Sequence, residues 1–403
     1  MNSFELRPDS LEFVNNPYPS FQYLQEHDPV HWSPRLKSWV LTRYGEVRKV
    51  AIASDMSSNR LKPFFAAMPS EEAQKVGEII RYLSLWMVFN DAPDHARLRR
   101  LTTKVFTHGR MLGMRTTIEA LIEHLLRKID GREQIDLVAD FAGPLPALVI
   151  MRVLGVDIEH LALIKQLSDD MALFIGSSRG SPEKYAIAEQ ATHHMAVFFK
   201  SLIAERRRTP STDLISELIA VEDQGEHLSD DELIATCILL LFAGHETTTN
   251  HIANGMLSLL KFPEQMQRLR DDPGLAAQAV EELLRYDGPS GAQVRIVTRE
   301  TQLADKILEP GQRIFLMLNA ANRDPLAYKS PDDLLIGRKG PPHLTFGTGR
   351  HLCVGFPLAR LEGQLSFPAL LKRFPKIELT DQNPPWIHSL VFRGVQRLPV
   401  RVA

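Results

Sequence analysis

The stretch that decides the fold is Phe346-Gly347-Thr348-Gly349-Arg350-His351-Leu352-Cys353-Val354-Gly355. Its three glycines allow positive φ angles and let backbone N–H groups approach the cysteine sulfur, where hydrogen bonds stabilise a thiolate. A helix is predicted directly after it, at Pro357 to Glu362, with the positive end of its dipole near the sulfur. The stretch therefore predicts an anionic cysteine at position 353.

An isolated cysteine is more often a small buried residue in a turn than a reactive group. The ten residues around Cys353, however, closely resemble the heme-binding loop of the cytochrome P-450 family, of the soluble bacterial type. The resemblance implies that Cys353 is the axial ligand of a heme iron, and that its thiolate pushes electron density into the iron to favour O–O cleavage. It also implies that Phe346 lies against the sulfur side of the heme and that His351 lies near a propionate.

A long apolar helix forms a second pattern. Ser229 and Glu232 fit a capping box, and the helix is predicted to continue to about Leu260. Inside it, the segment Ala243-Gly244-His245-Glu246-Thr247-Thr248 contains residues that weaken a helix, so a requirement other than helicity selects them. Thr247 can donate a hydrogen bond back to the carbonyl of Ala243.

The resemblance makes these residues an acid–alcohol pair. In the family, the alcohol of Thr247 positions a water and Glu246 supplies protons towards dioxygen. Two other interpretations exist for the segment. Glu246 and the threonines are compatible with ordinary packing, and His245-Glu246 begins the H-E-x-x-H motif of zinc proteases. The protease motif fails because its fifth position is Thr249, and His251 lies well round the helix from His245.

Cationic side chains are the expected partners of the two heme carboxylates. A helix is predicted to begin near Asp91-Ala92-Pro93-Asp94, with an aspartate N-cap, and it places His95 and Arg99 one turn apart on one face. The resemblance implies that both pair with a propionate and that Arg295 is a further propionate ligand. Taken singly, each is more often a solvated surface residue.

The E-x-x-R pattern of Glu282 and Arg285 is uninformative by itself, since such pairs are common on helices. In the family it is buried and structural. Its third member would be Arg338, although Arg323 competes for this position.

Composition favours one large, mostly helical domain. The chain has 403 residues, 44% of them apolar, and no Gly/Ser-rich or Pro-rich linker divides it. Apolar residues recur at spacings of three and four residues over most of the chain, as in residues 117–126, which predicts helices. Strands are predicted only at 38–42, 313–317 and 397–402. We expect a mainly α fold with minor β, as in the cytochrome P-450 fold, with residues 1–403 as a single heme domain. Loops are predicted at 177–182 and 206–211.

Charge and hydropathy argue against nucleic-acid and membrane partners. The formal net charge is -2 with mixed signs, and the longest apolar run, residues 237–243, is far shorter than the roughly 20 residues of a membrane span. No signal peptide is visible at the N-terminus, so a cytoplasmic protein is expected. The two cysteines, Cys237 and Cys353, cannot form a disulfide framework.

The resemblance implies a heme-thiolate monooxygenase with heme b (iron protoporphyrin IX) as cofactor. It would insert one atom of dioxygen into a small hydrophobic substrate by hydroxylation or epoxidation. Electrons would come from a separate ferredoxin and an NAD(P)H-dependent ferredoxin reductase. Arg97, Arg100, Lys104 and Arg350 are candidates for a basic face on which the carrier docks, and they are equally compatible with an ordinary solvated charged surface. A peroxide-driven peroxygenase and a non-catalytic heme sensor are the alternatives, and Glu246 and Thr247 argue against the first.

The substrate pocket is expected from the resemblance at mostly apolar positions. These are residues 86–89, Phe174, Leu239, Leu240, Ala243, residues 290–294, Val391 and Phe392, with Gln293 as a possible polar contact.

Overall fold

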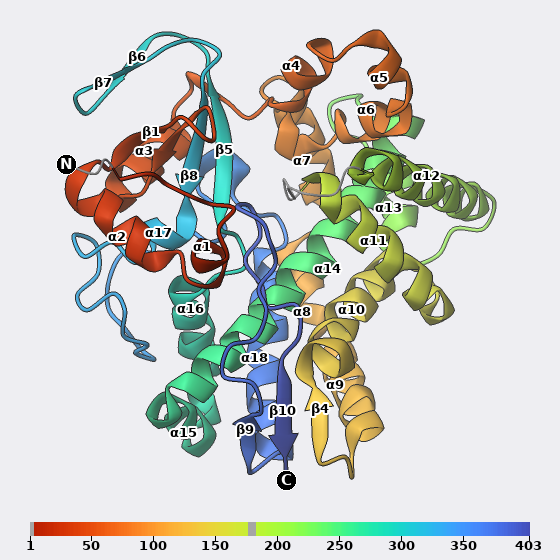
Figure 1. Ribbon diagram of the computed structural model, residues 1–403. Coiled ribbons are helices and arrows are strands. Elements are labelled where there is room, and N and C mark those ends of the chain that lie inside the picture. The colour runs from red at the N-terminus through yellow and green to blue at the C-terminus, as the bar shows by residue number, and fades with distance from the viewer. Residues whose placement is uncertain (1–3, 176–182) are drawn as a thin grey trace.

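A computed structural model describes residues 4–175 and 183–403 of the chain. Its longest helix, α14 (Asp230–Lys261), runs through the middle of the molecule (Figure 1). The predicted capping box is present, because Ser229 Oγ accepts from the Glu232 N–H and the Glu232 carboxylate accepts from the Ser229 N–H. The predicted apolar run 237–243 lies in this helix, and Cys237 is fully buried there.

The other α-helices lie on both sides of α14 (Figure 1). They are α1 (Leu11–Asn15), α2 (Tyr18–His27), α3 (Tyr44–Ile52), α4 (Leu61–Ala66), α5 (Ser70–Gln74), α6 (Gly77–Leu83), α7 (Asp94–Val105), α8 (His108–Gly113), α9 (Arg115–Ile129), α10 (Pro144–Leu154), α11 (Leu161–Ile175), α12 (Lys184–Arg208), α13 (Leu214–Ala220), α15 (Pro263–Asp271), α16 (Ala276–Tyr286), α17 (Leu318–Ala321) and α18 (Phe356–Arg373).

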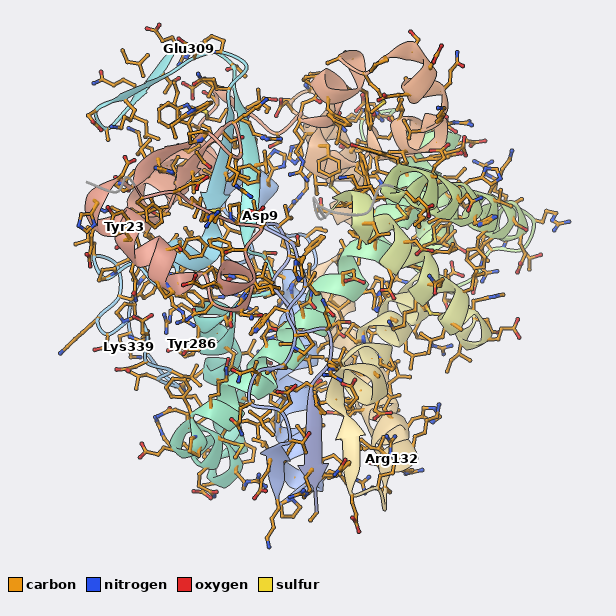
Figure 2. The ribbon with its side chains drawn as sticks, in the orientation of Figure 1. Asp9, Tyr23, Arg132, Tyr286, Glu309 and Lys339 are labelled. Carbon is orange, nitrogen blue, oxygen red and sulfur yellow. The ribbon has the colours of Figure 1, made fainter. Side chains whose placement is uncertain are left out.

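The largest sheet has five short strands in the order β1 (Val30–Ser33), β2 (Ser38–Leu41), β8 (Arg313–Met317), β5 (Ala292–Val297), β3 (Met56–Ser57). The β2–β8 pair is parallel and the other pairs are antiparallel. A three-stranded sheet has the order β4 (Gln134–Asp136), β10 (Pro399–Val402), β9 (Ile377–Leu379), and β6 (Thr301–Leu303) pairs with β7 (Lys306–Leu308). Figure 2 shows Glu309 beside the β6–β7 hairpin and Arg132 beside β4, at opposite ends of the molecule.

Apolar side chains of the helices form the main core. α14 contacts α10, α18, α12 and α16, and its residues from Leu233 to Leu241 are all buried. Two smaller clusters cover the two faces of the five-stranded sheet, one around Val47 and Leu316 and one around Phe21 and Phe315. Burial of alternate β8 residues on opposite faces explains why this strand reads as a continuous apolar run. The mainly helical class with minor sheets is confirmed.

Two local expectations were wrong. The helix that carries His95 begins at Asp94 with Pro93 as its N-cap, and the Asp91 carboxylate instead accepts hydrogen bonds from Ser57 and Ser58. The predicted loop 206–211 begins only at 209, because α12 continues through its arginines to Arg208. The other predicted loop, 177–182, lies outside the described residues. Over residues 4–175 and 183–403, no helix is both long and apolar enough to cross a bilayer.

Candidate active site

The Cys353 loop has the special backbone that its glycines predicted. Gly347 and Gly349 have φ angles of 70° and 67°, a region that other L-residues rarely adopt, whereas Gly355 has an ordinary φ of -86°. The Cys353 N–H donates to Phe346 O at 2.9 Å, which closes the loop on itself. The helix α18 begins at Phe356, three residues after the cysteine.

The sulfur of Cys353 is held by backbone donors. The N–H groups of Gly355 and Phe356 are directed at it, and the positive charges of Arg99 and Arg360 also favour the thiolate. Burial outweighs these effects and raises the pKa of the thiol above its ordinary value. Cys353 lies inside the protein, but its side chain is exposed to a cavity that it lines. A metal ion bound in this cavity would deprotonate the thiol by coordinating its sulfur.

The helix α14 forms another part of the wall of this cavity. It contributes Leu239, Leu240, Ala243, Gly244, Thr247, Thr248 and His251. The hydroxyl of Thr247 donates to Ala243 O at 2.9 Å, as predicted. Gly244 serves helix packing as well, because a Cβ at this position would lie only 3.0 Å from Ile150 of α10.

Glu246 is not among the residues that line the cavity. Its side chain is hydrogen-bonded to Asp169 of α11, and burial, followed by the charge of Asp169, raises its pKa to about 8. The neighbouring His245 is buried, which lowers its pKa to about 4, so its 3.7 Å approach to Glu246 is a contact of two neutral groups at pH 7. The structure therefore places the two members of the predicted acid–alcohol pair side by side in sequence but on different faces of α14.

Four predicted cationic residues gather at one end of the cavity. The rings of His95 and His351 lie 4.2 Å apart, and Arg99 donates to Leu352 O at 2.6 Å. His95, Arg99 and His351 line the cavity. Arg295, on β5, is 5% exposed and does not line it, but its charge contributes to lowering the pKa of His351.

The electrostatics of this cluster shows that no carboxylate of the described residues neutralises its positive charge. Burial, with the charges of His95 and Arg295, lowers the pKa of His351 to about 3. Burial, with the charge of Arg350, lowers the pKa of Arg295 to about 10. Within the described part of the chain, none of these four side chains forms an ion pair with a carboxylate, and the His351 ring is neutral at pH 7 because its pKa is about 3. A cofactor with two carboxylates at this edge and a metal facing Cys353 fits these residues.

The E-x-x-R pair is a buried structural unit. Arg285 donates to both oxygens of Glu282 at 2.8 and 2.9 Å, and Arg338 donates to Glu282 Oε1 at 2.9 Å. Arg323 instead donates to Tyr286 O, and its guanidinium lies 3.7 Å from the centre of the Tyr286 ring. The third member is therefore Arg338.

Some of the expected pocket residues line one of two cavities, whereas Trp86, Gly291, Ala292, Val391 and Phe392 line neither. Those that line the Cys353 cavity are Met87, Val88, Leu239, Leu240, Ala243, Ser290 and Gln293. Phe89, Phe174 and Val294 line a second cavity. Trp86 and Phe392 are packed against Phe242, with ring centres 5.7 and 6.1 Å away.

Two polar residues of the site were missed. Glu362 of α18 lines the Cys353 cavity and is 1% exposed, and burial raises its pKa well above the ordinary value. A carboxylate between the apolar residues of a helix was the available signal. Ser58 is 2.9 Å from His351 Nε2, and this contact between distant segments had no sequence signal.

The expected basic docking face is largely neutralised. Arg97 pairs with Glu232, while Arg100 and Lys104 pair with Asp223. Arg350 donates to backbone carbonyls, among them Ala53 O. Acidic side chains from other segments therefore compensate much of the positive charge of this face.

Comparison with known proteins identifies relatives over the whole chain. The family model described as "Cytochrome P450" matches residues 66–273 and 274–397. The "Biotin biosynthesis cytochrome P450" of Bacillus subtilis (strain 168) is 35% identical over 97% of both chains, and the "Polyketide biosynthesis cytochrome P450 PksS" of the same organism is 34% identical over 100% of both.

Solved structures share the fold. The structure of P450BioI in complex with a hexadec-9Z-enoic acid ligated acyl carrier protein has a TM-score of 0.91, with 33% identity, and the match covers 98% of this chain and 99% of that one. The structure of the myxobacterial cytochrome P450 CYP267B1 in complex with myristic acid has a TM-score of 0.88, with 32% identity, and covers 98% of both chains.

Proposed function

The chain belongs to the cytochrome P450 family and is a heme-iron monooxygenase, and we propose that it hydroxylates or epoxidises a small hydrophobic organic substrate in the Cys353 cavity. When bound, the heme iron activates dioxygen, so that one oxygen atom enters a substrate bond and the other leaves as water, with two electrons and two protons consumed. The observation that carries the proposal is that Cys353, from the loop before α18, and Thr247, from α14, line one cavity.

We propose that Cys353 is the axial ligand and that His95, Arg99, Arg295 and His351 hold the two heme carboxylates. Their lack of carboxylate partners within the described residues supports this role. A heme of the b type is favoured because covalent attachment of a c-type heme needs a C-x-x-C-H motif, and the two cysteines are far apart in the sequence. Phe346 lines the cavity beside the cysteine and would pack against the same face of the heme.

Thr247 and Glu246 have separate tasks in this proposal. The Thr247 hydroxyl donates to Ala243 O and leaves its own oxygen free to accept a hydrogen bond from a water in the cavity. Glu246 remains protonated at neutral pH because burial and Asp169 raise its pKa. It is therefore a proton donor on the face of α14 that does not line the Cys353 cavity. A rotation of its side chain or a chain of waters would carry the proton to the Thr247 side.

The proposed substrate class and electron donor are those common in the family. Apolar residues such as Val88, Leu239 and Leu240 line the cavity and favour a hydrophobic substrate. The long-chain acyl groups in two of the matched structures support the same class. We propose a ferredoxin with its NAD(P)H-dependent reductase as electron source, docked by shape and a limited number of charges, since Arg97, Arg100 and Lys104 are already paired with acidic side chains.

Turnover with a surrogate ferredoxin and reductase tests the proposal through Thr247→Ala. The ratio of product to NADH consumed should fall by roughly tenfold or more while hydrogen peroxide release rises, because the water that delivers protons loses its partner. Thr247→Ser should retain coupling. Thr249→Ala, in the same helix but off the cavity wall, is the matched control.

Two results contradict the proposal. Product formation from hydrogen peroxide alone, with coupling unaffected in Thr247→Ala, indicates a peroxygenase. Absence of any product across hydrophobic substrates, with substrate-dependent spectral changes intact, indicates a sensor.

A further inference from the structure

A second cavity of about 830 Å³ lies between the helices and the five-stranded sheet. α4, α11 and α12 form one side of it, and β1, β5 and β8 form the other, as their positions in Figure 1 show. Its two walls therefore come from segments that are distant in the sequence.

Aromatic and aliphatic side chains make most of the wall. Phe174 stacks on Phe65 with ring centres 6.2 Å apart, and it contacts Phe64 and Tyr185 at 6.4 and 5.9 Å. On the sheet side, the cavity is lined by Val294, Ile296 and Phe315. A hydrocarbon chain would find continuous apolar contact between these walls.

The polar part of the wall carries only one sign of charge. Lys37, Arg60, Lys184 and Arg313 line the cavity, and no aspartate or glutamate is among its described lining residues. Clefts lined by one sign of charge concentrate ligands of the opposite sign. The chain as a whole has a net charge of -2, so this segregation is local.

Arg60 contacts an aromatic ring with its side chain. Its guanidinium lies 4.9 Å from the centre of the Phe89 ring, and no described residue accepts a hydrogen bond from it. Burial, followed by the charges of Arg313 and Arg295, lowers its pKa to about 10, so it stays charged at pH 7. A partly buried charge beside two like charges is unfavourable until an anion neutralises it.

No described residue lines both the second cavity and the Cys353 cavity, but residues that follow one another in the chain line one cavity each. Val88 lines the Cys353 cavity and Phe89 lines the second one, and on β5 Gln293 and Val294 divide in the same way. The tail of a molecule anchored at Arg60 would have to pass between these residue pairs to reach Cys353.

We infer that the second cavity binds the carboxylate of an amphipathic substrate, with Arg60 as the anchoring residue and the apolar tail reaching the Cys353 cavity. The inference rests on the proposed function and narrows its substrate to long-chain carboxylic acids. Oxygenation would then occur away from the carboxyl end. The charge of Arg60 would select for a carboxylate, since the apolar walls of the cavity accept any hydrocarbon chain.

Calorimetric titration of the heme-loaded protein with tetradecanoic acid and tetradecan-1-ol tests the inference without turnover. The acid should bind roughly tenfold more tightly than the alcohol, since a charge-assisted hydrogen bond contributes about that factor. Arg60→Gln should remove this preference by weakening the acid alone, and Arg60→Lys should keep part of it. Arg127→Gln removes an exposed arginine of α9 and serves as the matched control.

Three outcomes would overturn the inference. The alcohol binds as tightly as the acid in the unchanged protein, Arg60→Gln leaves the acid affinity unaltered, or Arg60→Gln lowers the heme content, which would make Arg60 a partner of the heme carboxylates. Acid binding that depends on Arg60 in a protein that oxygenates nothing would refute the proposed function and leave this inference standing.

Discussion

The Cys353 loop and the middle of α14 face the same cavity, but interactions of different range determine them. The loop is defined within ten residues, by the positive φ angles of Gly347 and Gly349 and by the hydrogen bond from Cys353 N–H to Phe346 O. In α14 the backbone is an uninterrupted helix. There the raised pKa of Glu246 depends on burial and then on Asp169, which another helix brings into contact.

This difference explains which signals are specific. A loop that needs glycine at defined positions leaves a pattern that few other structures would produce. A helix accepts many residues at each position, so its functional side chains are distinguished by their neighbours. Substitutions in the two regions should therefore differ in kind, and the following predictions test this from the largest expected effect to the smallest.

Cys353→Ala should abolish monooxygenase activity and the thiolate-type absorption spectrum of the carbon monoxide complex, because the loop offers no second sulfur. The measurement is the reduced carbon monoxide difference spectrum together with product formation. Cys237→Ala, in the buried part of α14, is the control and should retain both. If Cys353→Ala keeps the thiolate spectrum, the loop is not the ligand site and the comparison fails.

Gly347→Ala should destabilise the loop by about 1–2 kcal/mol, because alanine at a φ of 70° has an unfavourable contact with its own backbone. The free energy of unfolding and the heme content both measure the effect. Gly109→Ala is the control, since a Cβ there meets no atom within 4 Å and the position lies in α8. Equal losses in the two variants would mean that the loop geometry has no special requirement.

The stability of the protein should depend on pH through Glu246. Its pKa is about 8 in the folded state against an ordinary value of 4.5, so between these pH values the folded state keeps a proton that the unfolded state has released. Stability therefore falls as pH rises through this window, by up to about 1.4 kcal/mol per pH unit. Glu246→Gln should flatten this slope in denaturant titrations at a series of pH values, and parallel curves for the two proteins would contradict a raised pKa of Glu246 in the folded state.

Several elements were predictable because their signals are local. The capping box at Ser229, the strand Arg313–Met317 and the hydrogen bond from Thr247 to Ala243 all involve neighbouring residues. The strand β5, which carries Arg295, was not predicted, because its pairing with β8 is decided by distant residues. The N-cap of α7 was wrong for a related reason, since Asp91 bonds to Ser57 and Ser58.

The sequence by itself determined the family, the candidate ligand Cys353 and the mainly helical class, since short motifs with strict backbone requirements carry that information. Only the tertiary structure decided that Arg338 completes the Glu282 pair, that the supposed basic face is neutralised, and that Arg60 is left charged in an apolar cavity. The physical reason is that the pairing and burial of a charge depend on which distant segments come into contact. The order of residues along the chain does not state which segments these are.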